Sequence, residues 1–264
     1  MVMAVRAPTR FPVKAPLLAV QASERTLPMW HESLWMMEWM ALRMSPVYWG
    51  QGVRPGNGDP VVVVPGFLCT DAYMFEMYRW LRRVGYDPHM SRIGWNVDCP
   101  RASSERLEDT VKRVHQKTGR RVRVVGHSLG GILGRHVALQ RPDLVSQVVF
   151  LGTPLQAVHA HPAVVATAVA LMGARSVVSG DYCLKAGCEC DFTADARRPL
   201  PASVQHAAIY TRGDGVVDWQ DARERDPRRN HEVGGTHIGL VYNPRAYRVL
   251  GEILAERRFG GIAA

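Results

Sequence analysis

A serine flanked by glycines, at residues 126–130 (GHSLG), is the feature that most constrains what this chain can fold into. It directly follows a β-branched run at 122–125, which predicts a strand buried on both faces, and directly precedes a helical pattern at 129–140. A serine on such a sharp strand-to-helix turn has a strained backbone, and small neighbours keep other segments from colliding with it. The turn lifts the hydroxyl out of the sheet, and we therefore predict Ser128 as a nucleophile.

The rest of the chain alternates short strand patterns with longer helical ones. This alternation predicts an α/β fold with a mostly parallel sheet of about six strands and helices on both faces. The expected strands lie at residues 61–64, 86–93, 122–125, 145–151, 207–211 and 232–233. The expected helices lie at residues 71–84, 103–118, 129–140 and 244–257, with Ser103 or Ser104 capping the second.

Two segments fall outside this alternation and suggest how the chain is divided. Residues 1–59 are expected to form an N-terminal arm and a helix that packs on the core, and residues 60–264 the α/β domain. The segment 154–203 is much longer than an ordinary connection, so it predicts a cap or lid inserted in that domain.

A helix is expected at residues 30–44, where apolar side chains recur at spacings of three or four. The members of this apolar stripe are Trp30, Leu34, Met37, Ala41 and Met44. We expect the helix either to pack on the core or to form an aromatic wall beside an acyl-binding cleft or a lipid surface.

The net charge of +9 raises the question of nucleic-acid binding. The arginines are scattered along the 264 residues, often as pairs, and no nucleic-acid-binding motif accompanies them. We therefore expect no nucleic-acid partner, and a solvated basic surface that can draw the protein towards anionic lipid or an acidic substrate.

Five cysteines are present. The spacing of Cys183, Cys188 and Cys190 does not match the usual zinc patterns, so no metal site is predicted. A disulfide within this cluster, or between Cys69 and Cys99, is left open because sequence alone cannot assign the pairing.

The compartment is not fixed by the sequence. No apolar run reaches the length of a membrane-spanning helix. Near the N-terminus, prolines interrupt an apolar patch that is too short for a signal peptide. The cytoplasm is therefore the default expectation, and secretion stays open.

A serine hydroxyl needs a base, and ten histidines are available. His237 lies in a glycine-rich loop, 234–239 (GGTHIG), between the last strand pattern and the last helix. We predict His237 as the base, and we expect the side chain of His127 to project away from the serine. The lesser candidates are His159, His161, His206 and His231.

The acid that orients such a histidine is predicted to be Asp214. It follows the expected strand 207–211 in a loop loosened by glycines on either side. Asp218 and Asp221 are its rivals, but Asp218 is expected to begin a helix, where an aspartate often serves only as a cap.

An oxyanion formed at Ser128 needs two N–H donors. The backbone of Leu129, the residue after the nucleophile, should supply one. The other should come from the loop after the strand 61–64, where Gly66 permits a tight turn and Phe67 offers its N–H.

Four segments together resemble the α/β-hydrolase superfamily and, within it, compact bacterial lipases and esterases. They are VVVVPGF at 61–67, VVGHSLGG at 124–131, GDGVVDW at 213–219 and GGTHIGL at 234–240. The resemblance covers about residues 60–254. It implies an α/β-hydrolase fold, the same roles for Phe67, Asp214 and His237, no cofactor, and cleavage of carboxylic esters through an acyl-enzyme. Pro65 departs from the family, which usually has a histidine there.

The sequence thus predicts a lipase-like or esterase-like serine hydrolase that acts on a hydrophobic acyl ester, with contact to a lipid interface left open. Three alternatives remain. The same triad could serve an acyltransferase or a polyester, amide or thioester hydrolase, because one fold hosts many reactions. The chain could also be a non-catalytic binding protein on this fold, or a membrane-surface adaptor.

Overall fold

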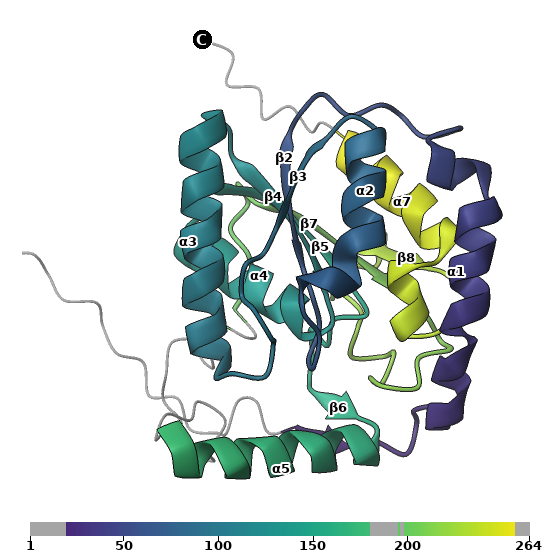
Figure 1. Ribbon diagram of the computed structural model, residues 1–264, viewed down its shortest axis with the longest axis vertical. Helices are drawn as coiled ribbons and strands as arrows, with labels where there is room; N and C mark the ends of the chain where they lie inside the picture. The colour runs from purple at the N-terminus through teal and green to yellow at the C-terminus, as the bar shows by residue number, and fades with distance from the viewer. Residues whose placement is uncertain (1–19, 180–194, 196–197, 257–264) are drawn as a thin grey trace, which may run out of the picture.

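The computed structural model describes residues 20–179, 195 and 198–256, and at its centre lies a six-stranded sheet (Figure 1). The strand order is β3-β2-β4-β5-β7-β8, and every neighbouring pair is parallel. The strands are β2 (Pro60–Val64), β3 (Asp87–Met90), β4 (Val122–His127), β5 (Val145–Leu151), β7 (Gln205–Tyr210) and β8 (Asn230–Glu232). The predicted α/β class and the expected number of strands are confirmed.

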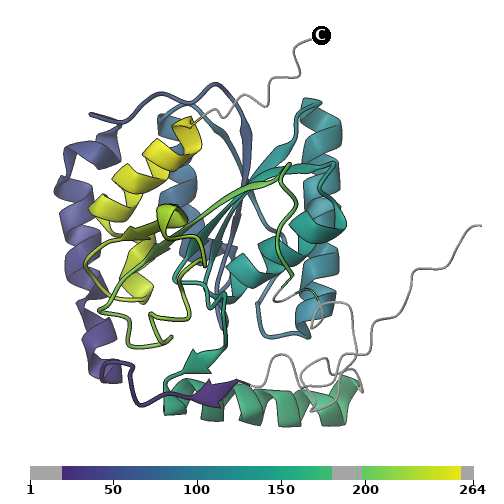
Figure 2. The ribbon, with the colours of Figure 1, turned by 180° about the vertical axis from the view of Figure 1, so that it is seen from behind.

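Helices cover both faces of the sheet (Figures 1 and 2). The α-helices are α1 (Trp35–Met44), α2 (Phe75–Arg83), α3 (Pro100–Thr118), α4 (Leu129–Gln140), α5 (Pro162–Ser179) and α7 (Pro244–Ala255). Short 3-10 helices are η1 (Met29–Leu34), η2 (Pro46–Trp49), η3 (Asp71–Met74), η4 (Pro227–Arg229) and η5 (Ile238–Val241). Each predicted helix therefore exists, although two of them begin with a 3-10 segment.

Side chains alternate between the two faces along β2, and this alternation divides the core into two apolar clusters. Val61 and Val63 point into a cluster shared with α2 and α7, and Val62 and Val64 into one shared with α3 and α4. All four valines are fully buried, as expected for a central parallel strand covered on both faces.

The predicted cap of α3 is wrong. The helix begins earlier, with Cys99 at the N-cap position and Pro100 as its first residue, so Ser103 and Ser104 lie buried inside it. Proline is favoured at this first position because its fixed φ suits a helix and its missing N–H would have no intrahelical partner.

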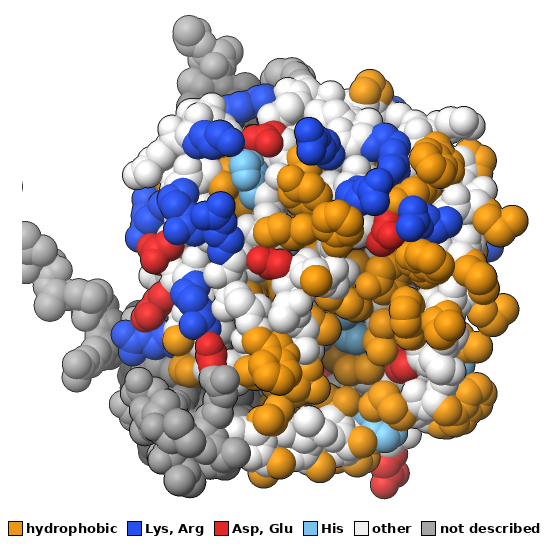
Figure 3. Space-filling view, viewed as in Figure 1, with side chains coloured by type: hydrophobic (Ala, Val, Ile, Leu, Met, Phe, Trp, Pro, Cys, Tyr) orange, Lys and Arg blue, Asp and Glu red, His pale blue; other side chains and the backbone are white. Residues whose placement is uncertain are grey.

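Of the two expectations for the segment at 30–44, packing on the core through its apolar stripe is not observed. Trp30 (70% exposed), Met37 (62%) and Met44 (85%) face solvent, and Leu42 is the buried apolar residue of α1. Figure 3 shows hydrophobic side chains gathered on the side of the molecule where α1 lies. The segment does pack on the domain, but through a different set of side chains, which is described below with the site.

The chain before η1 and α1 is held at the end of the sheet where β5 finishes. Strand β1 (Gln21–Ala22) pairs in parallel with β6 (His159–Ala160), which follows β5. Helix α5, which lies within the predicted cap, is beyond β6 at the end of the sheet where β5 finishes (Figure 1). A lid role for α5 stays a prediction.

The disulfide left open between Cys69 and Cys99 is not formed, since both are free thiols. Cys183, Cys188 and Cys190 lie outside the described residues. In the described part of the chain, no helix combines the length and apolar character needed to span a membrane.

Candidate active site

Ser128 lies on the turn between β4 and α4 with a backbone that few residues adopt. Its φ of 51° and ψ of −124° put it in a strained region, and its side chain is almost buried at 9% exposure. The Ser128 N–H donates to the carbonyl of Leu151, at the end of the neighbouring strand β5, over 2.8 Å. Strain of this kind concentrates at functional sites, where the surrounding fold holds it in place.

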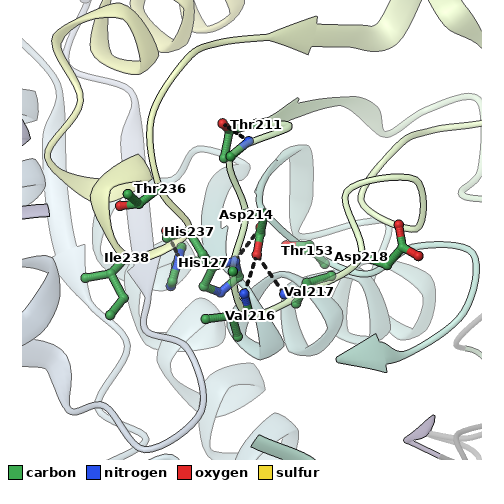
Figure 4. Close-up of polar contacts among 12 residues, drawn as sticks. His127, Thr153, Thr211, Asp214, Val216, Val217, Asp218, Thr236, His237 and Ile238 are labelled. Atoms are coloured by element: carbon green, nitrogen blue, oxygen red, sulfur yellow. Dashed lines mark hydrogen bonds and ion pairs between the residues drawn. The ribbon is translucent and has the colours of Figure 1, made fainter. Parts of the chain in front are cut away.

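Asp214 and His237 form a buried pair at the same end of the sheet (Figure 4). The His237 Nδ1 and the Asp214 Oδ2 are 2.6 Å apart, and the two residues are 3% and 2% exposed. The other carboxylate oxygen, Oδ1, accepts from the backbone N–H groups of Val216 at 2.9 Å and Val217 at 2.7 Å. Because a carboxylate accepts, Nδ1 carries the hydrogen and Nε2 keeps its lone pair.

Gly152 lies between the serine turn and the His237 imidazole. It follows Leu151, which accepts the hydrogen bond from Ser128, and has a φ of +55°. A Cβ atom at Gly152 would lie 3.0 Å from the His237 Nδ1, so the imidazole packs directly over this backbone. In the described structure no hydrogen bond joins the Ser128 hydroxyl to His237; such catalytic contacts are often long in a free protein and tighten with substrate.

The loop after β2 lies directly against the serine turn. A Cβ atom at Gly66 would come within 2.9 Å of the His127 Nδ1 and 3.1 Å of the Ser128 Cβ, so only glycine fits. Among the described residues, the N–H groups of Phe67 and Leu129 make no hydrogen bond to the protein. Two unpaired donors thus lie on the two segments that meet at Ser128.

His127 remains part of the site. Its ring centroid lies 4.7 Å from that of His237, and its Nε2 donates to the His237 carbonyl over 3.0 Å. Burial, and next the proximity of His237, hold the pKa of His127 well below its usual range, so this ring is neutral. It therefore acts as a hydrogen-bond donor that fixes the backbone of the histidine loop.

The rival aspartates have other partners. Asp218 accepts from Ser23 at 3.2 Å and from the N–H of Gln220 at 3.1 Å, within a turn and not at the start of a helix. Asp221 accepts from the Nδ1 of His159 over 2.7 Å. Of the three aspartates in this loop, Asp214 is the one hydrogen-bonded to His237.

Two glutamates from the N-terminal helical segment complete the site, and sequence reasoning assigned them no role. Glu32 in η1 accepts hydrogen bonds from the backbone of the Asp214 and His237 loops. Glu38 in α1 accepts from the N–H and the hydroxyl of Thr236 at 3.2 and 2.7 Å. The sequence signal that could have found them is that they are the only acidic residues in the largely apolar stretch 30–44.

Within the described residues, no group of three or more His, Cys, Asp or Glu side chains could hold a metal ion.

Part of the chain resembles known proteins. Residues 64–176 match the family described as alpha/beta hydrolase fold. A segment of 124 residues is 33% identical to a triacylglycerol lipase of Burkholderia plantarii and covers 44% of this chain and 35% of that lipase. A segment of 104 residues is 33% identical to a triacylglycerol lipase of Pseudarthrobacter phenanthrenivorans, covering 36% and 33%. The matches span about a third of the length of these lipases.

Solved structures share the fold over a larger part of the chain. A lipase of Bacillus licheniformis in its mature form superposes with a TM-score of 0.56 at 19% identity, covering 80% of this chain and 99% of that one. Lipase B of Aspergillus fumigatus gives a TM-score of 0.54 at 18% identity, covering 97% and 63%.

The parallel sheet and these matches define a protein of the α/β-hydrolase fold. More particularly, part of the chain resembles bacterial triacylglycerol lipases.

Proposed function

We propose that this protein hydrolyses carboxylic esters through an acyl-enzyme, with Ser128, His237 and Asp214 as its catalytic triad. The observation that carries the proposal is the buried 2.6 Å hydrogen bond between His237 and Asp214, next to a strained serine turn. This arrangement gives a serine, a base with a free Nε2 and an acid, in the roles that acyl transfer requires.

In the first half of the reaction, the Ser128 oxygen attacks the ester carbonyl while the Nε2 of His237 takes the hydroxyl proton. Asp214 stabilises the imidazolium that forms. The N–H groups of Phe67 and Leu129 bind the oxyanion, and the adjacent N-terminus of α4 adds a favourable dipole. Collapse of the tetrahedral intermediate breaks the bond to the alcohol, which leaves with the proton from His237.

In the second half, water replaces the alcohol. His237 takes a proton from water as the water oxygen attacks the acyl carbonyl, and the oxyanion forms again at the same two N–H groups. Breaking the bond between the acyl carbon and the Ser128 oxygen returns the proton to the serine and releases the carboxylic acid.

The substrate class we favour is a lipid ester, because the surface around the oxyanion loop is apolar. Leu68, which follows Phe67, is 41% exposed, and its carbonyl accepts a 2.8 Å hydrogen bond from the ring of Trp95, which is 58% exposed. The similar lipases named above are described as acting on triacylglycerols. Helix α5 would then act as a lid over this end of the sheet, and the exposed stripe of α1 would meet the lipid interface.

A series of p-nitrophenyl esters with acyl chains of increasing length tests the proposal. We expect release of p-nitrophenol, with a preference for longer chains if the apolar surface holds the acyl group. Preference for the shortest chain would contradict a lipid substrate but keep the esterase reaction. If no ester of the series is cleaved, ester hydrolysis is wrong and acyl transfer to another acceptor becomes the better candidate.

The pH dependence of the reaction follows from the environment of His237. Burial lowers the pKa of this imidazole, but the charge of Asp214, its hydrogen bond, and the charge of Glu32 together outweigh burial and leave the pKa raised above its usual value of 6.5. Only the neutral imidazole can accept the serine proton, so kcat/KM should fall as the pH drops through a midpoint above 6.5. A midpoint below 6.5 would contradict His237 as the base.

A further inference from the structure

We propose that Glu32 is a positioning residue of the triad: its buried carboxylate fixes the loops that carry Asp214 and His237 and places a second negative charge near the imidazole. This inference rests on the proposed function, because it gives Glu32 a part in the same reaction. It also gives the N-terminal helical segment a role that its sequence did not suggest.

Three backbone N–H groups converge on the Glu32 carboxylate. Its Oε1 accepts from Gly215 at 2.7 Å and from His237 at 3.1 Å, and its Oε2 accepts from Ile238 at 2.8 Å. Gly215 directly follows Asp214, and Ile238 directly follows His237. One side chain therefore ties the acid loop to the histidine loop, each at the residue next to its catalytic group.

The carboxylate is buried without a cationic partner. Glu32 is 3% exposed, and among the described residues no Lys or Arg forms an ion pair with it. Burying a charge is costly unless hydrogen bonds compensate, and here only N–H dipoles do so. Its negative charge is thus not cancelled locally, and it can stabilise a positive charge that develops on His237.

Glu38 provides the comparison within the same structure. It also holds the histidine loop, through Thr236 and through the side-chain amide of Asn243 at 2.8 Å, but it is only half-buried. It makes no hydrogen bond to His237 or to the Asp214 loop. Both glutamates therefore contribute to loop structure, whereas Glu32 alone bridges the two catalytic loops.

The titratable groups around the imidazole determine whether removal of the Glu32 charge raises or lowers the pKa of His237. The titratable residues that face His237 or its loop are Asp214, Glu32, Glu38, His127 and Tyr73, and His31 lies beside Gly213 in the acid loop. Burial raises the pKa of Tyr73 well above its usual range, and His127 is neutral as described above. The carboxylates of Asp214 and Glu32 favour the protonated imidazole, so removal of the Glu32 charge lowers the pKa of His237.

The test replaces each glutamate by its neutral, equally long amide and measures ester hydrolysis against pH. For Glu32→Gln we expect kcat to fall by about 10- to 100-fold with little change in KM, since hydrogen bonds to a charge beside the base are weakened. The acid limb of the pH profile of kcat/KM, where the rate falls as His237 becomes protonated, should move to lower pH by about half a unit or more. A pKa shift of this size is expected when one charge is removed at several ångströms in a partly buried site. In Glu38→Gln the limb should stay at its wild-type position.

A substrate-free readout separates this inference from the proposed function. The titration of the His237 imidazole, followed by NMR with His237→Gln for assignment, should move to lower pH in Glu32→Gln. That result would support the role of the charge even if no ester were cleaved. An unmoved titration in folded Glu32→Gln, or a kcat equal to that of the wild type, would overturn the inference.

Glu32→Asp covers the case in which Glu32→Gln does not fold. It keeps the charge but shortens the side chain, so the three N–H contacts cannot all be kept. We expect a reduced kcat with the acid limb near its wild-type position. A kcat equal to that of the wild type would show that the positions of the three N–H contacts to the carboxylate do not affect catalysis.

Discussion

Ser128→Ala is expected to lower kcat for p-nitrophenyl esters by at least about a thousandfold, because no other group can form the acyl-enzyme. The Ser128 hydroxyl makes no hydrogen bond to the described part of the protein, so its loss should cost little stability. Thermal unfolding of the variant should therefore match that of the wild type. The serine should also be the site labelled by a serine-directed fluorophosphonate.

Ser33→Ala is a suitable control, since Ser33 is exposed and, among the described residues, its hydroxyl donates only to the Trp30 carbonyl. It should retain wild-type activity and labelling. If Ser128→Ala instead kept activity within about tenfold of the wild type, a triad nucleophile at this position would be wrong, because loss of such a group costs far more.

The second large effect is expected at the acid. Asp214→Asn should lower kcat by about ten-thousandfold, because the amide cannot stabilise the imidazolium and favours the wrong tautomer of His237. The acid limb of kcat/KM should also move to lower pH, since the nearby charge that favours the protonated imidazole is removed. Both changes follow from the buried 2.6 Å contact between Asp214 and His237.

Asp218→Asn is the matched control, because Asp218 lies in the same loop and is also buried, at 3% exposure, but bonds to Ser23 and Gln220. Its kcat should stay within a few-fold of the wild type. A large loss in Asp218→Asn with a small one in Asp214→Asn would reverse the assignment of the acid.

Much of this fold can be predicted from sequence because its signals are local. A strand buried on both faces is recognisable as a β-branched run, as in β2 and β4, and the bounds of α4 and β5 agree with those predicted. The order of serine, aspartate and histidine along the chain, each after a strand pattern, also indicates which residues meet. Parallel strands bring their carboxyl ends to one edge of the sheet, so residues that follow different strands become neighbours.

Prediction from the local sequence pattern was wrong where a hydrogen-bond partner from a distant segment determines which side chain is buried. Packing of the apolar stripe at 30–44 on the core was one of two expectations, yet Trp30, Met37 and Met44 are exposed while Glu32 is buried. A carboxylate can be buried in place of an apolar side chain only if hydrogen-bond donors surround it. Those donors come from two loops that lie 183 to 206 residues further along the chain.

By itself, then, the sequence determined the parallel α/β sheet, the strained serine turn and the candidate triad residues, because short strands, glycine turns and chain order encode them. Only the tertiary structure decided that Asp214 and not Asp218 contacts His237, that Cys69 and Cys99 stay free, and that two glutamates hold the loops. The physical reason is that a hydrogen bond depends on the position and direction of both partners. For residues far apart in the chain, packing alone sets these.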